Sequence, residues 1–223
     1  MTTRIKICGI TSLEDALSAL EAGADYLGLI FAQSSPRRVE NAAAREIIAG
    51  VEKRAKIVGV FKDQELGFVS KLAEDLALDY VQCHGKESVD YARSLPVRVI
   101  KVLELQGIES LEPTSESIDM VLKTWKDFAE FALFDRPKSL GDPQWYRRAV
   151  AQLQAAAPLS MPYFFAGGLS AENVGEVVEA LQPYAVDVAS SVEISPGKKD
   201  VSKMNNFCKA VKRDCGGVSA CAH

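Results

Sequence analysis

Short apolar runs alternate along the chain with longer stretches of helical period. Eight of these runs are rich in β-branched and aromatic residues and are apolar at nearly every position, which is typical of parallel strands covered on both faces. They predict strands at Arg4–Cys8, Asp25–Phe31, Lys56–Phe61, Tyr80–His84, Arg98–Leu103, Glu130–Asp135, Tyr163–Ala166 and Ala185–Ala189.

The stretches between these runs predict helices. In the first stretch, Ser12 is suited to cap the N-terminus of a helix and Gly23 to end it. Regular helices are expected at Ser12–Ala22, Asn41–Glu52, Gln64–Ala77, Asp142–Ala156, Ala171–Leu181 and Val201–Lys212, and less regular ones at Glu87–Ser94 and Glu109–Lys123.

Eight strand–helix units in 223 residues, spaced by about 26 residues, predict the α/β class and a single (β/α)8 TIM barrel. A doubly wound open sheet is the competing architecture, but it usually has fewer strands and a glycine-rich first turn. No linker rich in Pro, Gly or Ser divides the chain. We therefore expect residues 1–214 to form one catalytic barrel domain and residues 215–223 to form a disordered C-terminal tail.

Composition narrows the possible partners and the compartment. Apolar residues make up 48% of the chain and charged residues 25%, as in globular proteins, and the net charge is −4. The absence of a long basic run or a long apolar run argues against nucleic acid and membrane as partners. Five cysteines without a CxxC pair, and an N-terminus without an apolar leader, predict reduced thiols and a cytoplasmic location.

Scarce residue types exclude several chemistries. The chain has two histidines, His84 and His223, so a multi-histidine metal site is excluded and a Ser-His-Asp triad would have to use His84. The GxGxxG fingerprint of dinucleotide binding and the P-loop are both absent. The remaining chemistry must come from side chains at the carboxyl ends of the strands, where TIM barrels build their active sites.

Two of these strand ends favour a phosphate. Gly167 and Gly168 follow the seventh predicted strand, and Ser190 and Ser191 follow the eighth. Glycine lets backbone N–H groups approach an anion, serine adds hydroxyl donors, and the loops after strands seven and eight form the usual phosphate site of this fold. The alternative for the glycine pair is a turn at the start of a helix.

Other strand ends carry groups suited to proton transfer and recognition. Cys8 and Asp135 end the first and sixth strands and are candidates for a base and an acid. Their structural alternatives are a small buried apolar residue for Cys8, and a helix cap or a salt bridge to Arg136 for Asp135. Arg37 is placed to hold a substrate carboxylate, unless it belongs to a solvated basic loop with Arg38.

The fourth strand ends in two further polar residues, Gln82 and His84. Both are candidate substrate contacts because they stand at the same end of the barrel as Cys8 and Asp135. His84 has a structural alternative, a histidine satisfied by its neighbours at the rim. The sequence does not choose between the two.

Several motifs together resemble the phosphoribosylanthranilate isomerase family, in family order from about residue 4 to about residue 212. They are Lys6-Ile7-Cys8-Gly9-Ile10-Thr11, Gly28-Leu29-Ile30-Phe31, Ser35-Pro36-Arg37-Arg38-Val39, Val58-Gly59-Val60-Phe61, Val81-Gln82-Cys83-His84-Gly85, Leu133-Phe134-Asp135, Ala166-Gly167-Gly168-Leu169, and the run from Val186 to Glu193 followed by Pro196-Gly197-Lys198-Lys199-Asp200.

The resemblance implies an Amadori rearrangement in tryptophan biosynthesis, from an aminoaldose phosphate to an aminoketose phosphate. It implies Cys8 as general base, Asp135 as general acid and Arg37 as the ligand of the anthranilate carboxylate. It also implies a small phosphorylated substrate and no cofactor or metal. We expect a monomer or a homodimer.

One segment departs from the family pattern. Between Arg136 and Trp145 the chain is shorter than usual, with two prolines and one glycine where the family carries a glycine-rich run. This segment is expected to close less completely over the substrate, with Arg136 or Lys138 reaching the carboxylate beside Arg37. It leaves open a related barrel enzyme that acts on another phosphorylated sugar or amine, or a phosphate-binding protein without turnover.

Overall fold

In the computed structural model, which describes residues 2–105, 115–137 and 144–213, eight parallel strands close into a barrel. The strands are β1 (Arg4–Cys8), β2 (Tyr26–Ile30), β3 (Lys56–Phe61), β4 (Tyr80–Cys83), β5 (Arg98–Glu104), β6 (Phe131–Asp135), β7 (Tyr163–Phe165) and β8 (Ala185–Val188). Each pairs with its sequence neighbours, and β8 pairs with β1. The predicted TIM barrel is confirmed.

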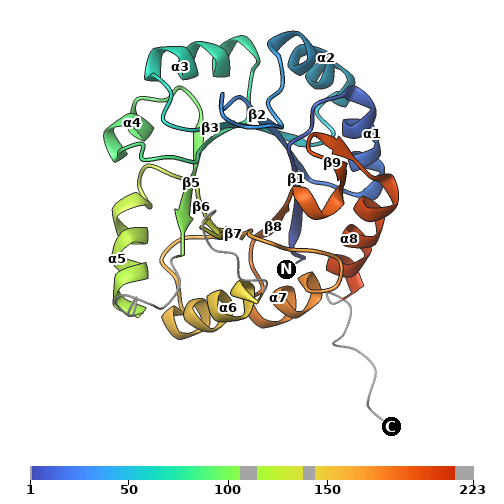
Figure 1. Cartoon of the computed structure of the whole chain (residues 1–223). Coiled ribbons are helices and arrows are strands. Elements are labelled where there is room, and N and C mark those ends of the chain that lie inside the picture. Colours follow the sequence, from blue (N-terminus) through green and yellow to red (C-terminus); the bar gives the residue numbers. More distant parts are fainter. Residues whose placement is uncertain (1, 106–114, 138–143, 214–223) are drawn as a thin grey trace.

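Helices surround the barrel as an outer ring (Figure 1). They are α1 (Leu13–Ala22), α2 (Asn41–Val51), α3 (Leu66–Asp75), α4 (Val89–Arg93), α5 (Ser115–Trp125), α6 (Trp145–Ala156), α7 (Val174–Leu181) and α8 (Val201–Arg213). The predicted ends of α1 are confirmed, because the Ser12 side chain accepts a hydrogen bond from the Asp15 N–H and Gly23 adopts a left-handed φ of 102°. The predicted tail 215–223 and Lys138 lie outside the described residues.

Two apolar clusters divide the core. The larger lies between the strands and the helices, and the smaller fills the barrel interior with residues such as Tyr26, Val58, Ile100, Leu133 and Phe164. Because strand side chains alternate, Lys6 and Cys8 share the interior face of β1. This alternation places the polar side chains at the strand ends inside the barrel, next to the smaller apolar cluster.

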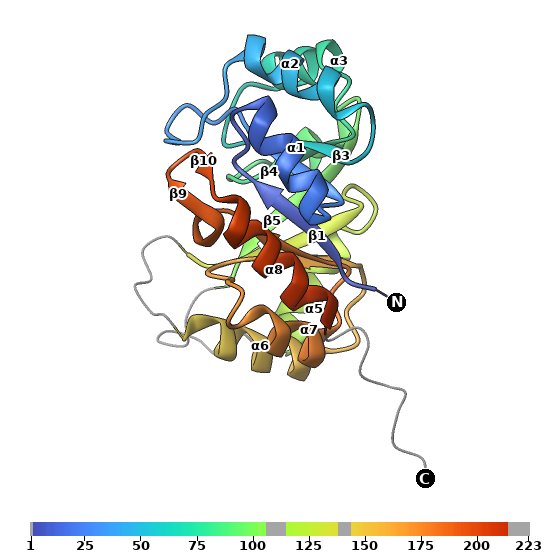
Figure 2. The same ribbon diagram turned by 90° about the vertical axis from the view of Figure 1, so that its right-hand side faces the viewer.

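The connection from β8 to α8 contains structure that the hydrophobic pattern did not predict. A 3₁₀ turn, η1 (Ser190–Val192), leads into a short antiparallel hairpin of β9 (Glu193–Ser195) and β10 (Lys198–Lys199). Figure 2 shows this hairpin at the end of the barrel toward which β1 points, away from the N-terminus. Its two- and three-residue strands are too short to give a periodic signal.

Among the described residues, no helix is both long enough and apolar enough to cross a membrane.

Candidate active site

A cavity of about 350 Å³ opens at the carboxyl ends of the strands. Its volume lies within the usual range of small-molecule sites. Eight of the nine predicted site residues line it, namely Cys8, Arg37, Gln82, His84, Asp135, Gly167, Gly168 and Ser190. A larger hollow of about 840 Å³ lies at the opposite end of the barrel, where Arg4, Tyr163 and Tyr184 contribute to its wall. None of the nine lines that hollow, so we assign the site to the smaller cavity.

Cys8 sits at the top of β1 in a charged setting. One layer below it, the Lys6 ammonium pairs with Asp187 of β8 at 3.0 Å, and both groups are almost fully buried. On the other side Cys8 pairs with Gly28 of β2. A Cβ built on Gly28 would lie 2.7 Å from the Cys8 sulfur, so the glycine leaves the space that the thiol occupies.

Burial and charge act on this thiol in opposite directions. Burial raises the pKa of Cys8 above its ordinary value, while the neighbouring Lys6 ammonium lowers it in part. Burial alone would lower the pKa of Lys6, but Asp187 and Cys8 raise it above its ordinary value. Lys6 is therefore a cation beneath the thiol, and it favours the thiolate once a proton is lost.

Asp135 ends β6 with fewer charged contacts. Its Oδ1 accepts a hydrogen bond from the Arg136 N–H at 2.8 Å, and its Oδ2 lies 3.6 Å from His84 Nε2. Burial raises the pKa of Asp135 to about 6, although the Arg136 N–H opposes this. About a tenth of this carboxyl is therefore protonated at pH 7, far more than for an ordinary aspartate, and this protonated form can act as a general acid.

Gln82 and His84 lie beside this carboxyl. Gln82 Nε2 and His84 Nδ1 are 3.3 Å apart, so the two side chains form a polar row that leads to Asp135. Gln82 is 1% exposed, and within the part of the chain that the structure describes its Oε1 has no hydrogen-bond partner. A buried, unpartnered amide oxygen in a cavity wall is suited to accept a hydrogen bond from a ligand hydroxyl.

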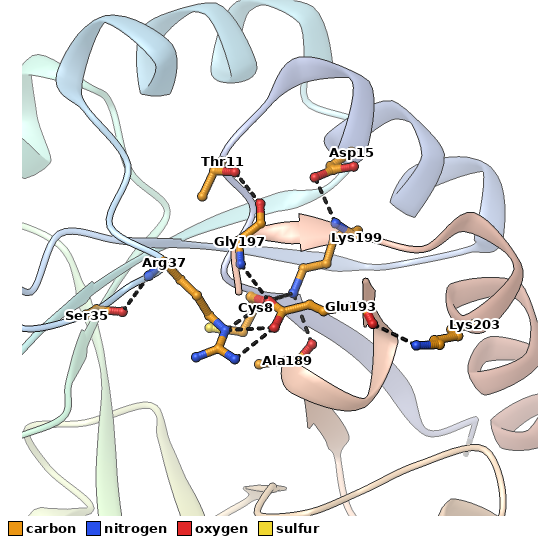
Figure 3. A network of polar contacts seen from close by, with 10 residues as sticks. All are labelled: Cys8, Thr11, Asp15, Ser35, Arg37, Ala189, Glu193, Gly197, Lys199 and Lys203. Carbon is orange, nitrogen blue, oxygen red and sulfur yellow. Dashed lines mark hydrogen bonds and ion pairs between the residues drawn. The ribbon is translucent and has the colours of Figure 1, made fainter. Parts of the chain in front are cut away.

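Arg37 enters the cavity from the loop after β2. The Glu193 carboxylate holds it from behind, with Arg37 Nε and Nη2 donating to its two oxygens at 2.9 and 2.8 Å (Figure 3). Arg38, the other residue of the pair, is 45% exposed and pairs only loosely with Glu40, at 3.5 Å. The solvated-loop alternative thus describes Arg38 and not Arg37.

Gly167 and Gly168 both adopt left-handed conformations, with φ of 89° and 76°. A Cβ on Gly167 would lie 2.6 Å from the Arg136 nitrogen, so only glycine fits there. Helix α7 begins at Val174, well after the pair, which argues against a turn at the start of a helix. The Asn173 side chain donates to the Gly168 carbonyl at 3.0 Å and fixes the loop that carries the glycines.

The two serines after β8 are placed differently. Ser190 lines the cavity, whereas the Ser191 hydroxyl donates to the Leu169 carbonyl at 2.5 Å and ties this loop to the loop after β7. Arg136 also reaches this region, because its Nη1 lies 3.8 Å from a Cβ built on Gly168. The guanidinium thus lies beside the predicted phosphate site.

Sequence reasoning missed three charged residues behind these groups, Asp187, Glu193 and Lys199. Asp187 interrupts an otherwise apolar strand on its interior face, a signal that could have identified it. Glu193 and Lys199 belong to the unpredicted hairpin, where no period was available to place them. In the part of the chain that the structure describes, no cluster of three or more His, Cys, Asp or Glu is arranged to hold a metal ion.

Comparison with known proteins identifies the family. A sequence model described as N-(5'phosphoribosyl)anthranilate (PRA) isomerase matches residues 5–210. The chain belongs to the phosphoribosylanthranilate isomerase family. The resemblance in the sequence motifs is thereby confirmed.

Individual relatives agree along nearly the whole chain. The N-(5'-phosphoribosyl)anthranilate isomerase of Geobacter metallireducens is 40% identical over 213 residues, covering 94% of this chain and 98% of the relative. The crystal structure of the Thermus thermophilus enzyme is 35% identical, with a TM-score of 0.76, and covers 95% and 99% of the two chains. A phosphoribosyl anthranilate isomerase in complex with reduced 1-(o-carboxyphenylamino)-1-deoxyribulose 5-phosphate is 31% identical, with a TM-score of 0.77 and coverage of 95% and 100%.

The predicted activity is confirmed with the family: the chain is an isomerase of tryptophan biosynthesis that converts N-(5′-phosphoribosyl)anthranilate to the aminoketose phosphate. Neither alternative, a related barrel enzyme or a binding protein without turnover, receives support from these relatives. A small phosphorylated ligand is likewise supported by the solved complex.

Proposed function

We propose that this cavity rearranges N-(5′-phosphoribosyl)anthranilate with Asp135 as general acid and Cys8 as general base. One observation supports this most directly: a carboxyl whose pKa burial raises to about 6 lines the same cavity as a buried thiol that has a lysine ammonium beneath it. Two titratable groups in contrasting environments are what acid–base catalysis on one substrate needs.

The acid step opens the ribose ring. Protonated Asp135 gives its proton to the ring oxygen, the bond from that oxygen to C1′ breaks, and the anilino nitrogen lone pair forms a C=N bond to C1′. The resulting Asp135 carboxylate is stabilised by the Arg136 N–H and lies 3.6 Å from His84 Nε2. His84 and Gln82 line the wall beside this carboxyl and would contact the ribose portion of the substrate.

The base step makes the enol. The Cys8 thiolate removes the proton from C2′, and the C–H electron pair becomes a C1′=C2′ bond as the C=N electrons return to nitrogen. Tautomerisation then moves a proton to C1′ and leaves a ketone at C2′. Because burial raises the pKa of Cys8, its thiolate is a minor species at neutral pH, and the Lys6 ammonium stabilises that species.

Two anion sites would hold the ends of the substrate. Arg37 presents its guanidinium to the anthranilate carboxylate, since charge and planar geometry suit a carboxylate. The phosphate would lie on the backbone N–H groups of Gly167, Gly168, Ser190 and Ser191, with Arg136 as an added cation. The nearness of Arg136 to Gly168 favours this role over the expected one beside Arg37 at the carboxylate.

A fluorescence assay with freshly made phosphoribosylanthranilate tests the proposal. The wild-type protein should consume the substrate, and Cys8→Ser and Asp135→Asn should each lose turnover while still binding a reduced analogue of the product. Retention of most of the activity by either variant would overturn its assignment. Phosphate soaked into crystals should appear beside Gly168, and density found only elsewhere would overturn the phosphate site.

We also propose a cytosolic enzyme that is a monomer or a homodimer. Three described cysteines, Cys8, Cys83 and Cys208, are free and buried, which suits a reducing compartment. The Thermotoga maritima relative is described as a dimer from which monomers were generated. Cell fractionation and light scattering would test the two statements.

A further inference from the structure

The hairpin between β8 and α8 places a buried carboxylate directly behind Arg37. The Glu193 carboxylate accepts hydrogen bonds from Arg37 Nε and Nη2 on one side and from Lys199 Nζ, at 2.9 Å, on the other (Figure 3). The Gly197 N–H adds a further contact at 3.3 Å. Glu193 is 6% exposed and does not line the cavity, so any effect it has on the substrate passes through its partners.

Lys199 extends this network to the main chain of the site. Besides Glu193, its ammonium donates to the Cys8 carbonyl at 2.6 Å and to the Ala189 carbonyl at 3.1 Å. Three N–H donors thus meet three acceptors, and the buried ammonium is satisfied. The ends of β1 and β8 are joined to the carboxylate that holds Arg37.

Glu193 uses only part of the arginine. Within the described residues no hydrogen-bond partner is found for Arg37 Nη1, and the Arg37 side chain, which lines the cavity, is 22% exposed. A carboxylate that grips Nε and Nη2 fixes the plane of the guanidinium and therefore the direction in which the remaining donors point. Burial alone would raise the pKa of Glu193, but Arg37 and Lys199 lower it, so it stays ionised and able to do this.

We propose that Glu193 is a positioning residue that orients Arg37 for the substrate carboxylate and, through Lys199, keeps this arginine in register with Cys8. The inference rests on the proposed role of Arg37 and deepens it, because it assigns the specificity for an anthranilate carboxylate to a pair of residues. Without Glu193, Arg37 would keep its positive charge, but its guanidinium would no longer be held in one orientation.

The test compares two stable ligands, the reduced product analogue and the same analogue without its ring carboxylate, by calorimetry. The ratio of their dissociation constants measures recognition of the carboxylate alone, since both carry the phosphate. Glu193→Gln should reduce this ratio by about tenfold or more. Arg37→Ala should make the two dissociation constants about equal. The double variant should be no worse than Arg37→Ala, because the two changes act on one interaction.

Glu87→Gln is the matched control. Glu87 is also a buried carboxylate that binds a lysine, Lys101 at 3.0 Å, in a loop at the same end of the barrel, and it does not line the cavity. It should lower the thermal unfolding midpoint but leave the ratio unchanged. If Glu193→Gln does not fold, Glu193→Asp, which keeps the charge but is shorter by one methylene, should fold and still reduce the ratio.

The outcomes separate this inference from the proposed function. An unchanged ratio in folded Glu193 variants, with a reduced one in Arg37→Ala, would overturn the positioning role and leave Arg37 as the carboxylate ligand. Equal reductions in the Glu87 and Glu193 variants would show a merely structural effect and overturn it as well. An unchanged ratio in Arg37→Ala would overturn the assignment of Arg37 itself.

Discussion

The two sides of the cavity hold their reactive groups by different means. On the side of β1, β2 and β8, Cys8 lies above the Lys6–Asp187 pair and its carbonyl receives the Lys199 ammonium. On the side of β6, the contacts of Asp135 are a neighbouring backbone N–H and a histidine nitrogen 3.6 Å away. The proposed base lies among buried charged groups, whereas the proposed acid lies beside a backbone N–H and an imidazole.

This difference matches the two tasks. A base must lose a proton in a buried place, and a fixed cation nearby stabilises the anion that results. An acid needs a pKa raised toward neutral pH, which burial achieves when no cation is paired directly with the carboxyl. A close ammonium at Asp135 would lower its pKa and remove the acid.

The largest expected effect is on the base side. Cys8→Ser should lower kcat by about 10²–10⁴-fold, because a hydroxyl is a far weaker base at neutral pH than a thiol that ionises in part. Binding of the reduced product analogue should change little. Steady-state kinetics and calorimetry measure the two quantities, and Cys83→Ser, at a buried thiol outside the cavity lining, is the control.

On the acid side, Asp135→Asn should lower kcat by a similar factor and make the protein more stable. The folded-state pKa of Asp135 is raised to about 6, so between pH 4 and 6 the folded state binds more protons than the unfolded state and stability falls as pH rises. Asparagine removes this penalty, worth about 3 kcal/mol for a pKa raised from 3.8 to about 6. Urea unfolding should therefore show a gain that is absent near pH 4 and complete above about pH 6.

If Asp135→Asn and the wild type have the same free energy of unfolding at pH 4 and also at pH 7.5, the raised pKa of Asp135 is contradicted. If Asp135→Asn loses turnover without gaining stability, Asp135 would remain the general acid, but its pKa would be raised only when the substrate is bound.

A smaller loss is expected from crowding the thiol. A Cβ on Gly28 would lie 2.7 Å from Cys8 Sγ, so Gly28→Ala should displace the sulfur and lower kcat by about 10–100-fold with little change in KM. Gly67→Ala is the control, because a Cβ there meets nothing closer than 3.9 Å. Full activity of Gly28→Ala would show that the position of the thiol is not critical.

The smallest expected effect concerns Arg136. If its guanidinium adds to the phosphate site, Arg136→Ala should raise KM by about fivefold. The variant should also make KM less dependent on salt, because salt screens the attraction between an exposed cation and the phosphate, with a screening length of ~8–10 Å at physiological ionic strength. Lys138→Ala is the comparison variant. A KM that is the same in Arg136→Ala and wild type at every salt concentration would remove Arg136 from the substrate site.

The sequence predicted the barrel well because each strand is a largely apolar run that the fold buries on both faces. The sites at Cys8, Asp135 and Gly168 also followed, because TIM barrels build their active sites at the carboxyl ends of the strands. Glu193 and Lys199 behind Arg37 did not follow, because contacts such as that of Glu193 with Arg37 join positions 156 residues apart through a hairpin too short to show a period. These charged residues were missed because they are far in sequence from the side chains they contact, although their chemistry suits the site.

Trapping the open-chain intermediate tests the division of labour between Asp135 and Cys8 most directly. In a single turnover with cyanoborodeuteride, reduction of the Schiff base places deuterium at C1′, whereas reduction of the ketone product places it at C2′. Cys8→Ser should accumulate the C1′ label above a protein-free control, because ring opening proceeds and proton removal does not. Asp135→Asn should give no C1′ label above that control. Accumulation in Asp135→Asn and none in Cys8→Ser would contradict the assignment of acid and base to the two sides of the cavity.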